Sequence, residues 1–351
     1  MTFYILYILV TSVLVILVSS SKIEVRTFSW YLVFLVSFLF SGLRYQIGMD
    51  YLSYEGVFDN LSLNDVAYLE YGNYSLMYLI KLINGPYQLY ILITSFIICY
   101  SFFRFINLFS KNKTISLFVF LFFGLFFLSS LNFIRQFLAI SFFILALCSI
   151  QQNNKLKTII CIIISILFHT SAIVILPFFL AYKIQINLKH VVATICISML
   201  IVIYLYTILL KTSYGIYLER ASKINNDIPP SILFIALIMS SFFFLIHILH
   251  LNQKSFSDNF SLVLLTFSIC CLVPTILFRD LPYNIFLRIN NFFMVSYIVV
   301  IPNWIMSFKS IYIRILLQFF VYIILLSYFI RTAIILGPKY NLYPYNSIFS
   351  L

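Results

Sequence analysis

Long apolar runs separated by short polar segments make up most of the chain. The long runs are about 18 to 25 residues, the length that an α-helix needs to cross the hydrocarbon core of a membrane. A transmembrane β-barrel would instead alternate polar and apolar residues over segments of about ten residues. The pattern therefore predicts an all-α, polytopic integral membrane helix bundle with about 10–12 transmembrane helices.

The apolar runs place the predicted helices and assign residues 1–351 to a single transmembrane domain. Residues 74–83 are apolar but too few to cross alone, so we expect an interfacial or half-inserted helix there. The first run lacks a basic leader and a cleavage site, which indicates a retained helix and not a signal peptide. The predicted spanning helices cover residues 3–18, 28–43, 87–105, 115–128, 133–154, 191–210, 232–250, 260–278, 285–301 and 315–330.

One further run, residues 158–182, has polar residues at its centre. Its length of about 25 residues suits one tilted helix. The sequence FHTS around His169 and the following Pro177 interrupt it, which indicates instead a broken or re-entrant pair with His169 at its tip. The re-entrant form keeps the later basic loops on the cytoplasmic side, and both interpretations are open.

The polar stretch from Arg44 to Glu70 is the main acidic part of the chain. It contains five of the ten acidic residues, and no Lys or Arg follows Arg44 until Lys81. Because cytoplasmic loops are enriched in Lys and Arg, we expect the acidic stretch on the opposite face of the membrane. Residues 44–86, with their short interfacial helices, and residues 211–231 then form the two long outer loops.

The composition narrows the function classes. Hydrophobic residues make up 63% and charged residues 9% of the chain, and the mean hydropathy of +1.06 is far above that of soluble domains. The net charge of +12 comes from basic residues spread between apolar runs, so nucleic-acid binding is not expected. The six cysteines lack the paired spacing of a zinc site, and the common metal and phosphate motifs are missing from the sequence. We therefore expect neither a metal nor a cofactor.

A few ionisable residues beside the apolar runs are the candidates for chemistry. Such residues are costly near a membrane and tend to mark substrate or ion sites. Four of them are arginines expected toward the outer face, where the planar guanidinium suits a phosphate-bearing anion. The set comprises Arg44, Asp50, Arg135, His169, Arg279 and Arg288.

Structural roles for the same residues are open alternatives. Arg44 and Arg135 lie near helix ends, where arginine side chains often reach the membrane surface without binding a ligand. Asp50 would be the N-cap of an interfacial helix that runs to Asn60, with neighbouring tyrosines in the aromatic belt. His169 would be a buried histidine that is hydrogen-bonded between helices.

Four short motifs occur in the same order as in a known family. They are Arg44-x-x-x-Gly48-x-Asp50-Tyr51-x-x-Tyr54, Glu70-x-Gly72, Asn132-x-x-Arg135-Gln136-x-x-Ala139 and Phe168-His169-x-Ser171-Ala172; Arg288 in LRINNFF and the Tyr-Pro-Tyr tail match more loosely. With these motifs the chain resembles the EpsG-like branch of the Wzy-type polymerases of O-antigen and capsular polysaccharide.

The resemblance implies a glycosyltransferase at the periplasmic face of the bacterial inner (cytoplasmic) membrane. It would join oligosaccharide repeat units carried on undecaprenyl diphosphate, which leaves when an acceptor hydroxyl attacks the anomeric carbon. The product would be O-antigen, as in lipopolysaccharide biosynthesis, or capsule. The implied partners are the lipid-linked oligosaccharide, membrane lipid and a chain-length regulator protein, and no cofactor is implied.

For the reaction we expect Asp50 or His169 to activate the acceptor hydroxyl. Asp50 is slightly ahead because it lies on the polar outer face, whereas the imidazole has the better-tuned reference pKa. The residues expected to bind the diphosphate and the rest of the substrate are Arg44, Arg135, Arg279, Arg288, Tyr51, Tyr54 and Glu70.

Two other function classes compete with the polymerase. A membrane O-acyltransferase that modifies a surface polysaccharide should load its acyl donor from the cytoplasmic side, where candidate residues are few. A flippase or transporter of lipid-linked sugars should show internal repeat symmetry and charged residues along a full transmembrane path, whereas the candidates here gather toward one face.

Overall fold

The structure is a computed structural model, and all regular elements that it describes are helices. Within the described ranges there is no β-strand, which confirms the predicted all-α fold. The chain forms two units: unit 1 comprises Met1–Ala172 and Phe308–Leu351, and unit 2 comprises Ile173–Ser307. The single transmembrane domain stays a prediction. The described residues are 2–183, 237–245, 256–277 and 283–349, with the single positions 189, 193 and 196.

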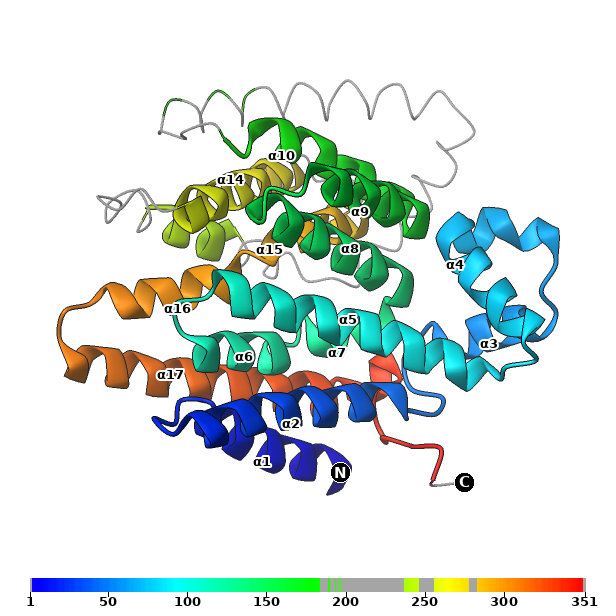
Figure 1. Ribbon diagram of the computed structural model, residues 1–351, viewed down its shortest axis with the longest axis horizontal. Coiled ribbons are helices and arrows are strands. Elements are labelled where there is room, and N and C mark those ends of the chain that lie inside the picture. Colours follow the sequence, from blue (N-terminus) through cyan, green and yellow to red (C-terminus); the bar gives the residue numbers. More distant parts are fainter. Residues whose placement is uncertain are drawn as a thin grey trace. The chain divides into compact units, whose positions relative to one another are not determined.

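The long helices of unit 1 are α1 (Thr2–Leu17), α2 (Ile23–Gly42), α5 (Tyr87–Phe109), α6 (Lys113–Phe122), α8 (Ile134–Gln151), α9 (Lys155–Phe168) and α17 (Ile311–Ile330). They pack largely in chain order: α1 contacts α2, α2 contacts α5, α5 contacts α8 and α8 contacts α9, while α17 contacts α6 (Figure 1). The apolar runs therefore predicted α1, α2, α5, α8 and α17 to within about five residues, because each of these runs is both long and continuous.

Aromatic side chains fill the spaces between these helices. Phe102 of α5 stacks on Phe120 of α6 with ring centroids 4.5 Å apart, and Phe118 of α6 stacks on Tyr322 of α17 at 4.0 Å. Small polar residues let α2 and α5 approach closely, as in the hydrogen bond of 2.9 Å between the hydroxyls of Ser41 and Ser95. Such contacts are typical of helix pairs in membranes.

Two apolar runs in unit 1 are broken; one continuous helix was expected for residues 115–128, and a break at His169 was one of two interpretations for residues 158–182. The run at residues 115–128 contains the end of α6 and the start of α7 (Phe127–Asn132), with non-helical residues between them. The run at 158–182 breaks after α9 at His169, whose backbone is extended, and continues as the 3-10 helix η2 (Thr170–Ile175). The break at His169 was predicted, whereas that after α6 falls among phenylalanines and has no polar signal. A re-entrant path stays a prediction.

Unit 2 contains α10 (Leu176–Ala181), α14 (Phe256–Leu277), α15 (Tyr283–Met294) and α16 (Tyr297–Ser307), and residues 237–245 are helical. α14 contacts both α10 and α15. Pro177 lies in the first turn of α10, where no N–H partner is needed, so it opens a helix and does not kink one. The predicted helix 285–301 is divided between α15 and α16. The predicted helix 191–210, apart from positions 193 and 196, and the loop 211–231 lie outside the described residues.

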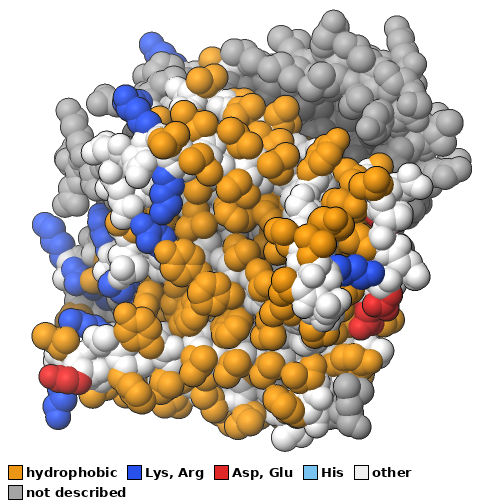
Figure 2. Space-filling model, turned by 45° about the vertical axis from the view of Figure 1, so that its right-hand side comes forward, with side chains coloured by type: hydrophobic (Ala, Val, Ile, Leu, Met, Phe, Trp, Pro, Cys, Tyr) orange, Lys and Arg blue, Asp and Glu red, His pale blue; other side chains and the backbone are white. Residues whose placement is uncertain are grey.

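Five helical segments of the described chain are long and apolar enough to cross a membrane: α2, α5, α8, Arg288–Ser307 and Ile311–Ile335. Their outer surfaces are apolar too. In α17 the side chains of Leu316, Phe319 and Ile324 are 55%, 59% and 63% exposed, which is unusual in water but normal beside lipid tails. Figure 2 shows one face of the molecule covered mostly by such hydrophobic side chains. These findings confirm a multi-pass membrane protein.

The acidic stretch carries short helices, as predicted for residues 44–86. They are α3 (Tyr51–Asp59), the 3-10 turn η1 (Leu63–Asp65) and α4 (Val66–Leu82). The Ser62 and Asp65 side chains form a reciprocal capping box that begins η1. α4 begins earlier than the predicted helix 74–83 and is kinked at Glu70. The position of these helices at the membrane surface stays a prediction.

The C-terminal segment of unit 1 returns to the loop that follows α2. After α17 the chain forms a π-helical turn η4 (Arg331–Ile335) and a 3-10 turn η5 (Gly337–Tyr340). The Tyr45 N–H then donates to the Asn346 carbonyl, and the Ile348 N–H donates to the Leu43 carbonyl, both at 3.0 Å. These hydrogen bonds form an isolated antiparallel β-bridge between Arg44 and Ser347. The tail therefore fixes the start of the acidic loop, a pairing that the sequence analysis did not predict.

Candidate active site

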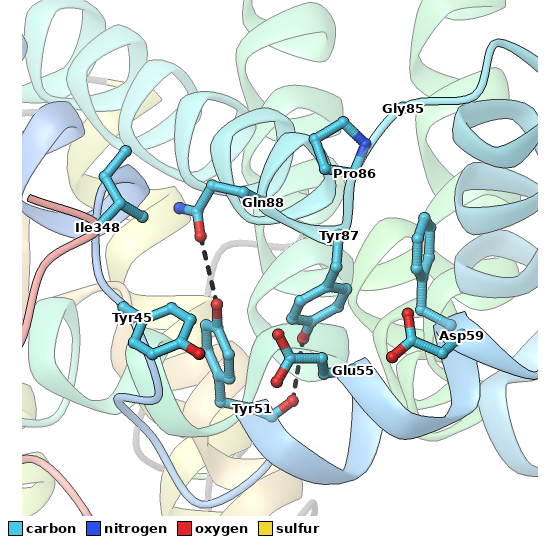
Figure 3. Close-up of a pocket in the computed structure, with 10 residues that line it drawn as sticks. Tyr45, Tyr51, Glu55, Asp59, Gly85, Pro86, Tyr87, Gln88 and Ile348 are labelled. Carbon is cyan, nitrogen blue, oxygen red and sulfur yellow. Dashed lines mark hydrogen bonds between the residues drawn. The ribbon is translucent and has the colours of Figure 1, made fainter. Parts of the chain in front are cut away.

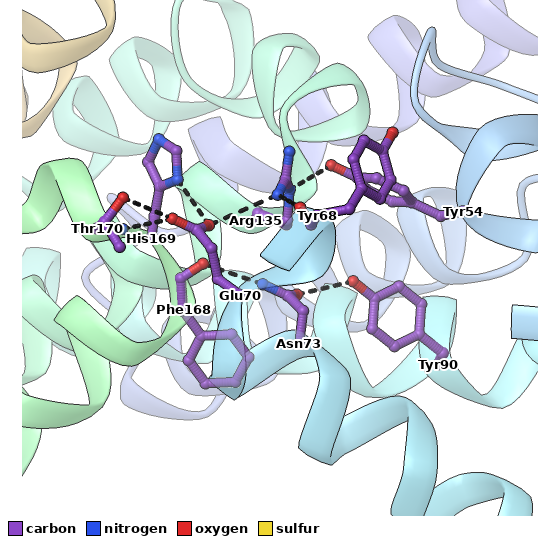
Figure 4. A network of polar contacts seen from close by, with 9 residues as sticks. All are labelled: Tyr54, Tyr68, Glu70, Asn73, Tyr90, Arg135, Phe168, His169 and Thr170. Atoms are coloured by element: carbon purple, nitrogen blue, oxygen red, sulfur yellow. Dashed lines mark hydrogen bonds and ion pairs between the residues drawn. The ribbon is translucent and has the colours of Figure 1, made fainter. Parts of the chain in front are cut away.

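Glu70 lies at the centre of a polar cluster in unit 1 and interrupts α4. Its backbone has φ +64° and ψ 156°, a region that costs a residue other than glycine about 1–3 kcal/mol. The kink directs its carboxylate toward the end of α9 (Figure 4). There Oε2 lies 2.9 Å from Nδ1 of His169, and Oε1 accepts hydrogen bonds from the Thr170 N–H at 2.6 Å and the Thr170 hydroxyl at 2.8 Å. The strained residue is held by three hydrogen bonds to the segment that carries His169.

A close approach of α4 to the end of α9 makes this geometry available. A Cβ atom on Gly72 would lie 2.9 Å from the carbonyl oxygen of Leu167 and from the N atom of Phe168, so only glycine fits. The Asn73 side chain donates to the Phe168 carbonyl at 3.0 Å and accepts from the hydroxyl of Tyr90 at 3.0 Å. The two residues of the motif Glu70-x-Gly72 therefore act together. Gly72 permits the close approach of α4 to α9, and this approach lets Glu70 bind His169 and Thr170.

Arg135, in the first turn of α8, completes the cluster. Its Nε donates to the Tyr54 hydroxyl at 2.5 Å and its Nη1 donates to the backbone carbonyl of Tyr68. The same Nη1 lies 3.6 Å from Oε2 of Glu70. The rings of Tyr54 and Tyr68 flank the guanidinium, with centroids 5.4 and 5.3 Å from its carbon. Two cation–π contacts and two hydrogen bonds thus fix its orientation.

The charges in the cluster favour an ionised Glu70. Burial alone would raise the pKa of the Glu70 carboxyl, but the hydrogen bond to His169, the positive charge of that ring when it is protonated and the two donors of Thr170 outweigh it, so its pKa lies below its ordinary value. Burial raises the pKa of the Tyr54 hydroxyl, which therefore stays protonated and neutral. The side chains of Glu70, His169 and Arg135 are 13%, 19% and 23% exposed, so a ligand can reach them.

The contact between Glu70 and His169 fixes the imidazole tautomer. An ionised carboxylate only accepts hydrogen bonds, so Nδ1 of His169 carries the hydrogen that points to Glu70. In the neutral ring Nε2 is then a hydrogen-bond acceptor and a base. Figure 4 shows this second ring nitrogen turned away from Glu70. The pair can therefore take a proton from a bound hydroxyl.

The first motif of the acidic loop is anchored to α7. Gly48 has φ +102°, and a Cβ atom there would lie 2.2 Å from the carbonyl oxygen of Leu131, so the position requires glycine on both counts. The Met49 N–H donates to the side-chain oxygen of Asn132 at 3.0 Å. This anchor sets the start of α3, which delivers Tyr54 to Arg135.

Of the residues predicted to act at the site, the structure joins Tyr54, Glu70, Arg135 and His169 in one cluster. Asp50 is at the N-cap position of α3, as the structural alternative predicted, but its side chain makes no capping hydrogen bond. Its charge contributes to the raised pKa of Tyr54, which places it near the cluster. Its catalytic role stays a prediction.

Three other predicted residues have different surroundings. Tyr51 is buried and its hydroxyl lies 3.2 Å from the side-chain oxygen of Gln88. Arg44 is 1% exposed, and its Nη1 donates to the Ser41 carbonyl and to the hydroxyls of Ser41 and Ser95, between α2 and α5. Arg288 is an exposed residue of α15 in unit 2. Arg279 lies outside the described residues, and the substrate-binding roles of these residues stay predictions.

Four residues of the cluster were missed by the sequence analysis. Thr170 follows His169 directly, so its place beside the histidine was the available signal. Asn73 is a buried amide within an apolar segment, and such amides need partners. Tyr68 contributes its backbone carbonyl and its ring face, and Tyr90 contributes its hydroxyl. Neither tyrosine belongs to one of the sequence motifs. In the described part of the chain no group of three or more His, Cys, Asp or Glu side chains could hold a metal ion.

Comparison with known protein families gives one match. The chain matches the EpsG family over residues 27–347, which includes every residue of the cluster. The comparisons with curated proteins and with solved structures find no match.

Proposed function

Because the chain belongs to the EpsG family of Wzy-type polymerase-like membrane proteins, we propose that it joins lipid-linked oligosaccharide repeat units into a surface polysaccharide. Membership makes it a polysaccharide polymerase-like protein of glycosyltransferase type. The proposal adds that the donor is an undecaprenyl-diphosphate-linked oligosaccharide and that the product is O-antigen or capsule. It also adds that the site faces the periplasm, in agreement with the acidic loop that carries it.

The observation that carries the proposal is the hydrogen-bonded pair of Glu70 and His169 beside Arg135. In the proposed reaction Nε2 of His169 accepts the proton of the acceptor hydroxyl. The hydroxyl oxygen forms a bond to the anomeric carbon of the donor, and the bond from that carbon to the lipid diphosphate oxygen breaks. Glu70 keeps the imidazole oriented and stabilises the positive charge that it gains, as carboxylates do beside other catalytic histidines.

Arg135 is proposed to bind the leaving diphosphate. Its guanidinium is fixed by Tyr54 and Tyr68 before substrate arrives, so little side-chain entropy is lost on binding. The contact to Glu70 is loose at 3.6 Å, which allows a diphosphate oxygen to replace it. Charge that develops on the leaving group is then stabilised by a preorganised cation. Arg279 and Arg288 are proposed as further cations, because both are arginines expected beside apolar runs toward the outer face; Arg288 also lies in a motif that loosely matches the family.

The geometry favours His169 over Asp50 as the base. Glu70 orients the His169 ring through a hydrogen bond of 2.9 Å at Nδ1, which leaves Nε2 to accept a proton, whereas Asp50 is the N-cap residue of α3. Asp50 is then proposed to orient the acceptor from the start of α3. A chain-length regulator protein is a proposed partner, since polymerases of this type make products of controlled length.

The test is complementation of a strain that lacks the gene. The expected product of wild-type protein is a ladder of long surface glycans, whereas His169→Gln, which cannot act as a base, should leave one repeat unit per lipid core. His190→Gln changes a histidine that is not among the predicted site residues and is the matched control. Equal amounts of each variant in the membrane must be shown by immunoblot.

Other outcomes contradict the proposal. Complete loss of repeat units in the deletion strain would indicate a flippase. An intact ladder that lacks acetyl groups would indicate an O-acyltransferase. A normal ladder made by His169→Gln would remove the imidazole from the reaction.

A further inference from the structure

A cavity beside α3 in unit 1 is separate from the cluster that the proposed reaction uses. Its volume is about 460 Å³, within the range of about 300–1,000 Å³ that is typical of small-ligand sites. Its walls come from the loop after α2, from α3 and from the start of α5, together with Ile348 of the C-terminal tail (Figure 3). The cavity therefore lies on the polar loop segment, at the end of the spanning helix α5.

Aromatic rings form the rigid part of these walls. Tyr51 and Tyr87 meet edge to face with centroids 5.2 Å apart, and Phe58 lies 5.6 Å from Tyr87. All three are buried, whereas Tyr45, 6.1 Å from Tyr51, is half-buried. The Tyr87 hydroxyl donates to the Tyr51 carbonyl at 3.3 Å. Fixed aromatic surfaces of this kind bind ligands at a small entropy cost.

The polar groups of the cavity are acidic or neutral. Glu55 and Asp59 contribute carboxylates and Gln88 contributes an amide, and the lining residues of the described chain include no Lys or Arg. Lys81 is near, but its ammonium donates to the Asp59 backbone carbonyl and stands over the ring of Phe58. A negative cavity repels phosphate, while carboxylates and amides are good acceptors for hydroxyl groups.

Helix α3 contributes side chains to both the cavity and the catalytic cluster. Tyr51, Glu55 and Phe58 recur at helical spacing and line the cavity from α3. Tyr54 projects from the same helix to hold Arg135. A ligand in the cavity and a diphosphate at Arg135 would therefore bind beside neighbouring side chains of one nine-residue helix, because Tyr54 is three residues after Tyr51 and four before Phe58.

We propose that this cavity binds an uncharged sugar ring of the oligosaccharide substrate, an inference that rests on the proposed function. The apolar face of the ring packs on Tyr45, which the buried tyrosines support from behind, and its hydroxyls donate to Glu55, Asp59 and Gln88. The diphosphate is excluded from the cavity and stays with Arg135. Both the acceptor unit and the growing chain carry such rings, so either of them could supply the sugar that binds in the cavity.

The experiment measures sugar binding by the full-length protein in lipid nanodiscs. The probe is the native host's surface polysaccharide, released from lipid by mild acid and fractionated to one repeat unit, observed by saturation-transfer NMR. Glu55→Gln and Tyr45→Ala should each weaken binding at least tenfold with unchanged thermal stability. The matched controls are Glu24→Gln, an exposed carboxylate in the first turn of α2, and Tyr312→Ala, a tyrosine that is 83% exposed at the start of α17.

The two sources give different results. Glu55-dependent binding of the released unit assigns the cavity to the acceptor, and Glu55-dependent binding of the lipid-linked unit alone assigns it to the donor chain. Wild-type affinity in both cavity variants, or displacement of the sugar by inorganic pyrophosphate, would overturn the proposal.

Because the readout is binding, it is independent of turnover. Normal ladders from His169→Gln would refute the proposed reaction and leave the cavity assignment standing. Lost ladders from His169→Gln with normal sugar binding in both cavity variants would refute only the cavity assignment.

Discussion

Arg44 and Arg135 carry the same sequence signal but have opposite surroundings in unit 1. Both lie at an end of a spanning helix beside a polar stretch. The Arg44 side chain is 1% exposed, and its hydrogen bonds go to Ser41 and Ser95. The Arg135 side chain is 23% exposed, stands between two aromatic rings and contacts a carboxylate. Position near a helix end therefore does not distinguish a structural arginine from one that can meet a substrate. The two are distinguished by the groups that each side chain contacts and by its exposure.

The largest expected effect is on activity, at Arg135. Arg135→Lys should lower the rate of repeat-unit polymerisation about 100-fold, because a point charge replaces a planar fork that is aimed at the diphosphate. The amount of protein in the membrane should not change. The rate is measured with purified protein and lipid-linked repeat units.

Arg104→Lys is the matched control, because Arg104 binds only neutral groups, the Tyr100 hydroxyl and the Gln152 amide, in its described hydrogen bonds. A full rate in Arg135→Lys would reduce Arg135 to a generic positive charge.

At Arg44 the main effect should be on stability. Arg44→Ala removes a large buried side chain and the donors that join α2 to α5, so the free energy of unfolding should fall by about 2 kcal/mol. Arg44→Met, which refills much of the space, should recover part of this loss. Thermal unfolding in detergent provides the measurement. Normal stability with abolished polymerisation would show that Arg44 acts on substrate and that the contrast with Arg135 is wrong.

Two glycines, one beside each arginine's surroundings, allow a further comparison of the Glu70 cluster with the Arg44 region. In Gly72→Ala the new methyl meets backbone atoms of Leu167 and Phe168 at 2.9 Å, so α4 and α9 must separate. The expected cost is about 1–3 kcal/mol together with reduced activity, because Glu70 and His169 sit on the two separated segments. In Gly42→Ala, beside Arg44, the methyl meets the terminal carbon of the flexible Leu92 side chain at 2.9 Å, so a smaller cost is expected.

Thermal unfolding and the polymerisation rate of both glycine variants are the measurements. Equal effects of the two substitutions would show that the approach of α4 to α9 has no special role.

The sequence predicted what depends on local composition. Continuous apolar runs located α1, α2, α5, α8 and α17, because length and apolarity alone decide whether a helix can span a membrane. Polar residues inside a run located the break at His169. The division between α15 and α16 lies at residues 295–296, where Ser296 is a single small polar residue and too weak a signal to predict a break.

The candidate site was predicted in its members but not in its arrangement. Glu70 was expected to bind substrate and Asp50 to lead the chemistry, whereas the structure pairs Glu70 with His169. That pairing depends on a strained backbone at Glu70 and a close contact at Gly72, which are properties of packing between distant segments. No local sequence pattern predicts the strained backbone at Glu70 or the close contact at Gly72.

The smallest expected effect concerns pH. The pKa of Glu70 is lowered in the folded protein, so its contribution to stability is full above its ordinary value near 4.5 and is lost as the pH falls through the lower folded value. Glu70→Gln should therefore be less stable than wild type at pH 6, and the difference should shrink below about pH 4.5. Arg44→Ala, at a site whose described hydrogen bonds involve hydroxyls and a carbonyl, should differ from wild type equally at both pH values. Melting temperatures across this range decide the point, and a difference for Glu70→Gln that grows with acidity would contradict the ionised pair.

The central claim is that Glu70 and His169 act as one catalytic unit, and a double-mutant cycle tests it directly. Polymerisation rates are measured for wild type, Glu70→Gln, His169→Gln and the double variant, all inserted in equal amounts. If Glu70 works through the imidazole, the double variant should be about as slow as His169→Gln alone, because the second substitution removes nothing further. Losses that multiply, so that the double variant is slower than His169→Gln by the full factor measured for Glu70→Gln, would show that the two residues act independently and would contradict the account.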